Sequence, residues 1–292
     1  MSKRRKPPAR SAPKQPKVRD VFVPRPFEGL ADEVEWIALR ELVPAATAPL
    51  TLAPSLVERY GDRSVTLATV LPMAWPALTK PDGRVLVGLQ RNTHSGDVSR
   101  DIALALLLAL EAEPGTSISV PPTPGPGERL QDVLADEQLD VSMRDGFEFW
   151  LDDEESDDPE VRASLERANA SIYPTVRLAA AHAAYWSRVP DRAHLRWVLP
   201  DDEDAALNTL ASLHAAGELT LGEGTRFAGM FRAHGRLVPV WDLPEEPPGE
   251  DWEAPFADFV KRYADTLAGG GELTAEARRA RQGLIARQVT LR

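Results

Sequence analysis

The pattern of hydrophobic positions first becomes regular after Asp32, and it predicts a helix there. Apolar side chains recur at roughly helical spacing at Val34, Trp36, Ile37, Leu39, Leu42 and Val43. Acidic residues occupy the first turn, where the helix dipole favours negative charge. Pro44 ends this helix, and residues 45–52 are expected to be extended. We expect the apolar stripe of the helix to pack on a sheet.

Further along the chain, hydrophobic spacing and turn signals predict a mixture of helices and strands. Helices are expected over 55–60, 98–111, 131–139, 159–169, 174–187, 201–214, 255–268 and 274–288. Strands are expected over 64–71, 84–89, 195–199, 227–232 and 237–242. Turn sequences predict β-hairpins at Lys80-Pro-Asp-Gly, at Arg144-Asp145-Gly146 between Val141 and Phe149, and at the Ala-His-Gly-Arg run 233–236.

The order of these elements favours an α+β fold, with antiparallel hairpins interspersed with helices and without a regular βαβ period. The stretch 114–127 holds five prolines and three glycines, and is a candidate boundary or a long surface loop. We therefore expect a basic tail (1–20), an N-terminal subdomain (21–113), the Pro/Gly-rich linker or loop (114–127) and a C-terminal subdomain (128–292), the two subdomains being packed together.

Charge is distributed unevenly between the tail and the rest of the chain. Residues 1–20 hold one acidic residue and eight basic residues, which are Lys3, Arg4, Arg5, Lys6, Arg10, Lys14, Lys17 and Arg19. The remaining chain has 26 basic and 44 acidic residues, a net charge of −18. The tail has too few large apolar side chains to fold by itself. Either it contacts an anionic partner, or it is a solubilising arm without a specific partner.

Composition excludes several kinds of site. The chain has no cysteine, which removes disulfides, thiolate nucleophiles and Cys-based zinc or iron–sulfur sites. The five histidines lack a metal-ligand spacing, so neither a metal nor another cofactor is expected. No apolar segment follows the basic start, and the apolar run 102–110 is too short to span a bilayer. A cytoplasmic protein with no membrane contact is expected.

The loop 90–97 is the segment most suggestive of function, because it joins a strand to a helix N-terminus and gathers Arg91, His94, Ser95 and Asp97. A helix N-terminus with Ser and Gly before it is able to hold a phosphate or carboxylate. His94 with Asp97 is a candidate base and orienting carboxylate. The sequence lacks both GxxxxGK[ST] and GxSxG, so no catalytic residue is assigned. The alternative without a ligand is that this loop only caps the helix and is exposed to solvent.

Two further features have weaker functional readings. The acidic run 152–158 lacks the spacing of a calcium loop and is interpreted as a solvated linker. The helix expected over 201–214, followed by a hairpin, has the order of a winged helix. Its acidic start and its lack of Lys and Arg argue against sequence-specific DNA recognition. Tryptophans in strand or helix contexts are expected in the core.

The opening run VPRPFEGL…EWIALRELVPAATAPLTL resembles the start of an actinobacterial family of uncharacterised proteins that carry a basic N-terminal tail. That family is a domain of unknown function, so the resemblance implies no activity and no site residues.

The charge partition and the absence of a catalytic pattern favour a non-enzymatic binding or adaptor module. Its basic tail would contact RNA, the ribosome or an acidic protein surface. The alternative is an enzyme or a small-anion-binding protein that uses Arg91, His94, Ser95 and Asp97.

Overall fold

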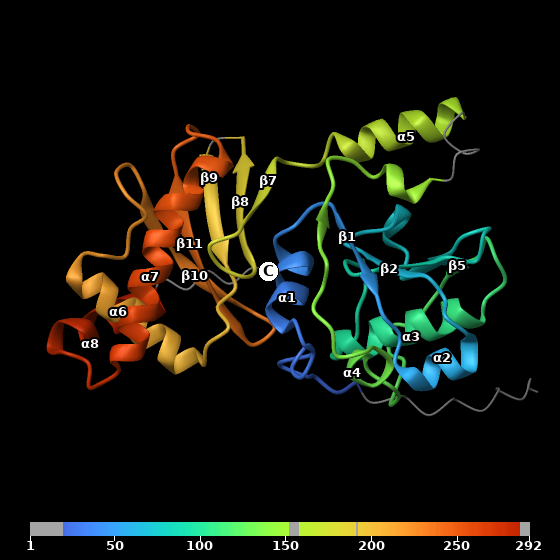
Figure 1. The fold of residues 1–292 in the computed structure, drawn as a ribbon, viewed down its shortest axis with the longest axis horizontal. Helices are drawn as coiled ribbons and strands as arrows, with labels where there is room; N and C mark the ends of the chain where they lie inside the picture. Colours follow the sequence, from blue (N-terminus) through green and yellow to red (C-terminus); the bar gives the residue numbers. More distant parts are fainter. Residues whose placement is uncertain (1–19, 152–157, 191, 287–292) are drawn as a thin grey trace, which may run out of the picture.

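Two separate β-sheets organise the chain, and helix α1 (Glu33–Glu41) lies between them (Figure 1). The computed structural model describes residues 20–151, 158–190 and 192–286. Helices and antiparallel-rich sheets are mixed along the chain, which confirms the α+β class. The helix expected after Asp32 is α1, and its stripe is buried as predicted.

The first sheet has the strand order β5-β3-β4-β2-β1-β6 and is antiparallel except for the parallel pair β2–β4. Its strands are β1 (Ala46–Leu50), β2 (Val65–Ala68), β3 (Ala77–Thr79), β4 (Val85–Gly88), β5 (Ser117–Ile118) and β6 (Ser142–Met143). The predicted turn at Lys80 joins β3 to β4, and Gly83 there has a φ of 86°. That value lies in the left-handed region, which glycine adopts without strain.

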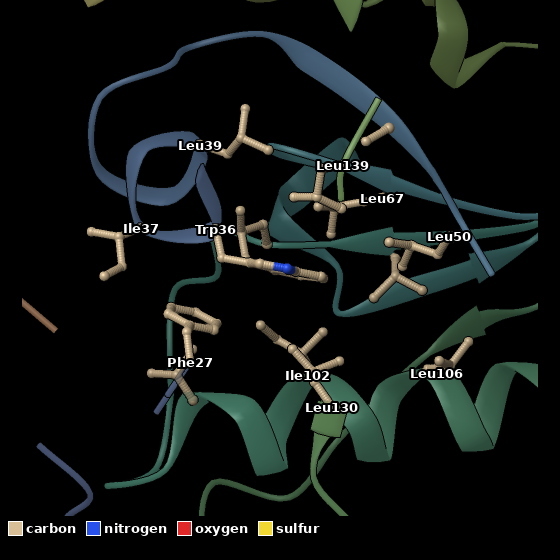
Figure 2. Packing of buried hydrophobic residues seen from close by; sticks show 14 of the residues in the cluster. Phe27, Trp36, Ile37, Leu39, Leu50, Leu67, Ile102, Leu106, Leu130 and Leu139 are labelled. Carbon is tan, nitrogen blue, oxygen red and sulfur yellow. The ribbon is translucent and has the colours of Figure 1, made fainter. Parts of the chain in front are cut away.

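Helices on the first sheet build what we call the N-terminal lobe. They are α2 (Pro54–Tyr60), α3 (Val98–Glu111) and α4 (Leu130–Val133). The next helix along the chain, α5 (Pro159–Asn169), has no buried residue. Asp97 caps α3 by accepting a hydrogen bond from Arg100 N at 3.3 Å. Figure 2 shows Ile102 and Leu106 of α3 facing Trp36 and Leu67. The apolar side of α3 is therefore part of the core.

The second sheet is antiparallel throughout, in the order β10-β11-β9-β8-β7. Its strands are β7 (Thr175–Leu178), β8 (Ala184–Val189), β9 (Arg192–Trp197), β10 (Arg226–Ala233) and β11 (Arg236–Leu243). The hairpin across 233–236 is confirmed. The helix expected over 174–187 is wrong, because β7 and β8 occupy that segment. Its alanines favour a helix locally, but cross-strand pairing decides the conformation.

Helices α6 (Glu203–Ala216), α7 (Glu253–Gly269) and α8 (Ala275–Ala286) lie together beside the second sheet and complete the C-terminal lobe (Figure 1). Aromatic side chains fill the space between sheet and helices. Trp241 packs edge-on against Phe259 with ring centroids 4.9 Å apart, and Trp197 packs similarly against Phe256 at 5.6 Å. These contacts confirm that tryptophans of this region pack in the core.

Residues 130–150 differ from the sequence expectation. The helix expected over 131–139 is only the single turn α4. The hairpin expected around Arg144 is not formed, because β6 pairs with β1 and residues 148–150 form a 3₁₀ turn. The first sheet thus includes β5 inside the Pro/Gly-rich stretch 114–127 and β6 beyond it. The chain passes from one sheet to the other between β6 and β7.

One continuous hydrophobic core crosses from the first lobe to the second. It contains Trp36 and Ile37 of α1 together with Tyr185, Phe231 and Val238 of the second sheet. Trp36 is stacked on Phe27 with ring centroids 5.9 Å apart (Figure 2). Because α1 contributes to both sides, the two lobes share buried surface rather than touching through solvated loops.

Candidate functional site

Two carboxylates at the start of α1 are buried where that helix meets the second sheet. Asp32, just before the helix, is 2% exposed, and Glu35 is 0% exposed. Asp32 accepts a hydrogen bond from Leu139 N at 3.0 Å and pairs with His182. The Tyr185 hydroxyl donates a hydrogen bond to Glu35. Buried carboxylates are costly unless paired, so these contacts define how the lobes meet.

His182 and Arg177 lie between these carboxylates and the solvent. Arg177 Nε is 3.5 Å from Glu35, and His182 Nε2 is 3.7 Å from the second Glu35 oxygen. The hydrogen bond with Asp32 raises the pKa of His182 above its usual value. Burial and the negative charge of Glu35 raise the pKa of the Tyr185 hydroxyl, which therefore stays protonated. The cluster thus places two groups with raised pKa values, His182 and Tyr185, against buried carboxylates where the two lobes meet.

The same face of the second sheet carries polar side chains beyond this cluster. Cross-strand pairing aligns Tyr185, Arg196 and Val240 in one row. It aligns Ser187, His194 and Asp242 in the next row. Successive residues of a strand point to opposite faces, so these rows share the face turned away from α6 and α7.

A cavity of about 350 Å³ lies over these rows, between the sheet and the C-terminal end of α1. Leu42, Met230 and Val240 are among its apolar walls, and His194 and Arg196 contribute polar groups. A β-bulge in β10, between Phe227 and Gly229, lies at its edge. Small-molecule sites have this character, with apolar walls and a few placed polar groups.

His194 and Asp242 lie next to each other on the wall of this cavity. His194 Nδ1 lies 3.1 Å from the Asp242 carboxylate, although without the alignment of a full hydrogen bond. Burial, followed by the positive charge of Arg196, lowers the pKa of His194. The imidazole is therefore neutral at pH 7. Asp242 also pairs with Arg192 at 3.5 Å and with Arg226, so its charge is already compensated.

Arg196 is the unsatisfied group of the cavity. Its guanidinium is half-buried and makes no hydrogen bond or ion pair with any residue in the described ranges. The two carboxylates that line the cavity, Glu41 and Asp242, are each paired with other residues. A positive group in this position is suited to binding an anion that enters the cavity.

The row of Ser187, His194 and Asp242 has the order of a nucleophile, a base and an orienting carboxylate. Ser187 is 1% exposed, however, and it does not line the cavity. Its hydroxyl therefore cannot reach a ligand held there, and the cavity has the chemistry of binding rather than of acyl transfer.

The four residues predicted in the loop 90–97 do not line one common cavity. Ser95 is occupied by Asp101, which accepts hydrogen bonds from Ser95 N at 2.6 Å and from Ser95 Oγ at 2.8 Å. Asp97 caps α3 and pairs with Arg129 at 2.8 Å. Arg91 lines a separate hollow beside Trp75. The helix-capping interpretation thus describes Asp97, and the structure does not bring the four side chains to one point.

His94 is exposed and lines, with Ser95, a hollow of about 630 Å³ between the lobes. Arg232 and His234 of the second lobe also line it, but both have partners. Arg232 pairs with Glu203, and His234 lies 2.9 Å from Glu41. This hollow offers less to an anion than the cavity beside Arg196 does.

Several predicted features lie outside the described residues. These are the eight basic residues of the tail and most of the acidic run, of which Asp158 is described and caps α5. Within the ranges that the structure describes, no group of three or more His, Asp or Glu side chains is arranged to hold a metal ion. In the same ranges, no helix combines the length and the hydropathy needed to cross a bilayer.

Sequence reasoning missed the cavity because its walls come from α1, β9, β10 and β11, which are far apart in the sequence and meet only in the folded chain. A usable signal was present in β9, where His194 and Arg196 alternate with Ala193, Leu195 and Trp197. This period of two indicates a strand with one polar face. Asp32 and Glu35 were read only as first-turn charges, although their spacing of three places both on one helix face.

The chain belongs to a family of unknown function, DUF5926, whose model matches residues 26–292. The resemblance drawn from the opening run, to a family without an assigned activity, is confirmed. No match was found among curated proteins or among solved structures.

Proposed function

We propose that the protein binds a small organic carboxylate in the cavity between α1 and the second sheet. The family to which the chain belongs has no assigned activity, so the proposal is argued from the cavity alone. The single observation that carries this proposal is the half-buried Arg196 side chain, which makes no hydrogen bond or ion pair with any described residue. A carboxylate would accept charge-assisted hydrogen bonds from it, and these are stronger than hydrogen bonds between neutral groups.

The remaining walls favour a ligand with an apolar body. Leu42, Met230 and Val240 offer apolar surface, so an aliphatic or aromatic group would be removed from water there. His194, being neutral, adds a hydrogen-bonding group without adding charge. The cavity volume of about 350 Å³ is at the lower end of the range for small-molecule sites, which fits a small metabolite.

Calorimetric titration with matched carboxylates and amides tests the proposal. Benzoate and hexanoate are titrated into the full chain and compared with benzamide and hexanamide, which keep the shape and lose the charge. Arg196→Met is compared with Arg192→Met, a residue of the same strand and face that pairs with Asp242 instead of lining the cavity. Charge-assisted bonds of about 1.5–3 kcal/mol predict a loss of roughly 10- to 100-fold in affinity.

The expected result is binding of a carboxylate but not of its amide, weakened by Arg196→Met and nearly unchanged by Arg192→Met. Equal affinities of acid and amide, or equal effects of the two substitutions, would exclude Arg196 as the anion-binding group. Absence of binding by every carboxylate at millimolar concentration would reject the proposed function.

The charge partition favours a second candidate function, in which the basic tail contacts an anionic partner such as RNA. Residues 1–20 carry a net charge of +7 while the rest of the chain carries −18. If the tail makes four or five phosphate contacts, affinity for single-stranded RNA should fall with salt along a log–log slope of about −3. Deletion of residues 1–20 should abolish binding. If neither chain binds RNA, this second candidate is rejected.

A further inference from the structure

Arg91 lines a hollow of about 290 Å³ at the edge of the first sheet, apart from the cavity beside Arg196. Its walls come from three segments of the chain, namely 74–76 before β3, 91–93 after β4, and 117–120 around β5. Asp and Glu are absent from these lining residues. We propose that this hollow is a second binding site, specific for a phosphate group.

The guanidinium of Arg91 has donors that the described structure does not use. Its Nε and Nη1 atoms are buried without a hydrogen-bond partner in the described ranges. Burial lowers the pKa of Arg91, and the negative charge of Asp101 opposes that shift. Asp101 itself accepts hydrogen bonds from Ser95. Nε and Nη1 are closed off from solvent, so an oxyanion in the hollow would meet the rest of the guanidinium, which likewise makes no hydrogen bond or ion pair in the described ranges. Donors held in a protein interior without acceptors are costly, and a bound oxyanion would supply an acceptor to this side chain.

The other polar groups of the hollow decide between a phosphate and a carboxylate. Asn92, Thr93, Ser117 and Ser119 surround Arg91 with an amide and three hydroxyl groups, all on exposed residues. Their side chains take part in no hydrogen bond within the described structure. A phosphate group presents three terminal acceptor oxygens, whereas a carboxylate presents two. The number and spread of donors therefore match a phosphate better, in contrast to the more apolar cavity beside Arg196.

The backbone on one side of the hollow is held in an unusual conformation. Met73 and Ala74 both have a φ of 53°, in the left-handed region that non-glycine residues rarely adopt. A Cβ atom at Gly88 would lie 2.6 Å from the Trp75 carbonyl oxygen, so only glycine lets this segment approach β4. The segment that bears Trp75 is thus fixed against the sheet next to Arg91, which gives the hollow a rigid wall.

Titration of the full chain with inorganic phosphate and with phenyl phosphate tests the site, followed by calorimetry and by ³¹P line width. The two probes distinguish a site for free phosphate from a site for a phosphate ester. Arg91→Gln removes the charge. Ser119→Asp places a negative charge at the rim through an exposed residue, and it leaves Arg91 in place. Ser55→Asp makes the same charge change at a distant exposed residue and serves as control.

We expect one equivalent of at least one probe to bind, with affinity reduced at least tenfold by Arg91→Gln and by Ser119→Asp. Ser55→Asp and Arg196→Met should leave the affinity unchanged, which separates this site from the carboxylate cavity. If Arg91→Gln does not fold, the affinity of Ser119→Asp for phosphate alone tests the proposal. Absence of stoichiometric binding by the natural chain, or binding that Ser119→Asp does not weaken, would overturn the proposal.

Discussion

The Tyr185 hydroxyl donates a hydrogen bond to the Glu35 carboxylate across 150 residues of sequence, in the interior between the two lobes. Glu35 is 0% exposed and Tyr185 is 1% exposed, so neither group has an alternative partner in bulk water. A buried polar pair of this kind fixes position more strictly than apolar contacts do, because misplacement leaves a charge unsatisfied.

Tyr185→Phe should therefore destabilise the protein. The substitution removes one oxygen atom, so the buried Glu35 carboxylate loses a hydrogen-bond donor. The free energy of unfolding should fall by about 1–3 kcal/mol. Urea denaturation followed by tryptophan fluorescence measures the change. Tyr60→Phe is the matched control, because its hydroxyl bonds the exposed Glu111 and its loss should cost much less. A loss no larger than that of the control would contradict the role given to this hydrogen bond.

The pairing of His182 with Asp32 should make stability fall as the pH rises above neutrality. The pKa of His182 is higher in the folded protein than in the unfolded chain, where it is near 6.5. Its contribution is fully present below that value, and it is lost as the pH rises through the folded pKa. His182 faces Asp32, Glu35 and Arg177, and the two carboxylates favour its charged form more than Arg177 opposes it.

This pH dependence is tested by denaturing His182→Gln and the natural chain between about pH 5.5 and about pH 9, a range that includes the ordinary histidine pKa. The difference in free energy of unfolding should be largest at the acidic end and should shrink towards the basic end. His194 has a lowered pKa and acts in the opposite sense, but it is present in both chains and cancels. His214→Gln, at an exposed helix position, should show no such trend. A constant difference across the range would refute the prediction.

Arg196→Met should leave the free protein as stable as before, or slightly more stable. The substitution removes an unpaired half-buried cation and keeps the unbranched apolar stem of the side chain. A gain of between zero and about 1 kcal/mol is expected, as for other residues kept for binding rather than for stability. Thermal denaturation without ligand measures it. A clear loss of stability would indicate that Arg196 has a structural partner and would weaken the proposed function.

Asp97→Ala should reduce stability and leave carboxylate binding unchanged. It removes the N-cap of α3, worth about 0.5–2 kcal/mol, and the ion pair with Arg129. Asp62→Ala, at an exposed position, serves as the control and should change stability by less than about 0.5 kcal/mol. If Asp97→Ala abolished carboxylate binding in a folded protein, the loop 90–97 would regain its place as the ligand site.

Local signals were sufficient for much of the fold. The stripe of α1 and the turns at Lys80 and His234 each depend on residues close in sequence, and all three were predicted correctly. The segment 174–187 was not, because its conformation depends on strands that pair with it from elsewhere in the chain. Arg196 and Glu35 could not be recognised for a similar reason. Their significance comes from what surrounds them, and those neighbours are brought together only by the folded chain.

The position of α1 near the beginning of the described chain has a consequence for biosynthesis. Ribosomes add about 5–20 residues per second, so the 150 residues between Glu35 and Tyr185 take on the order of ten seconds to make. During that interval the α1 surface that will meet the second sheet has been made, while the strands that cover it do not yet exist. A nascent chain therefore presents this surface, with its two carboxylates, to the ribosome surface and to chaperones before it can close.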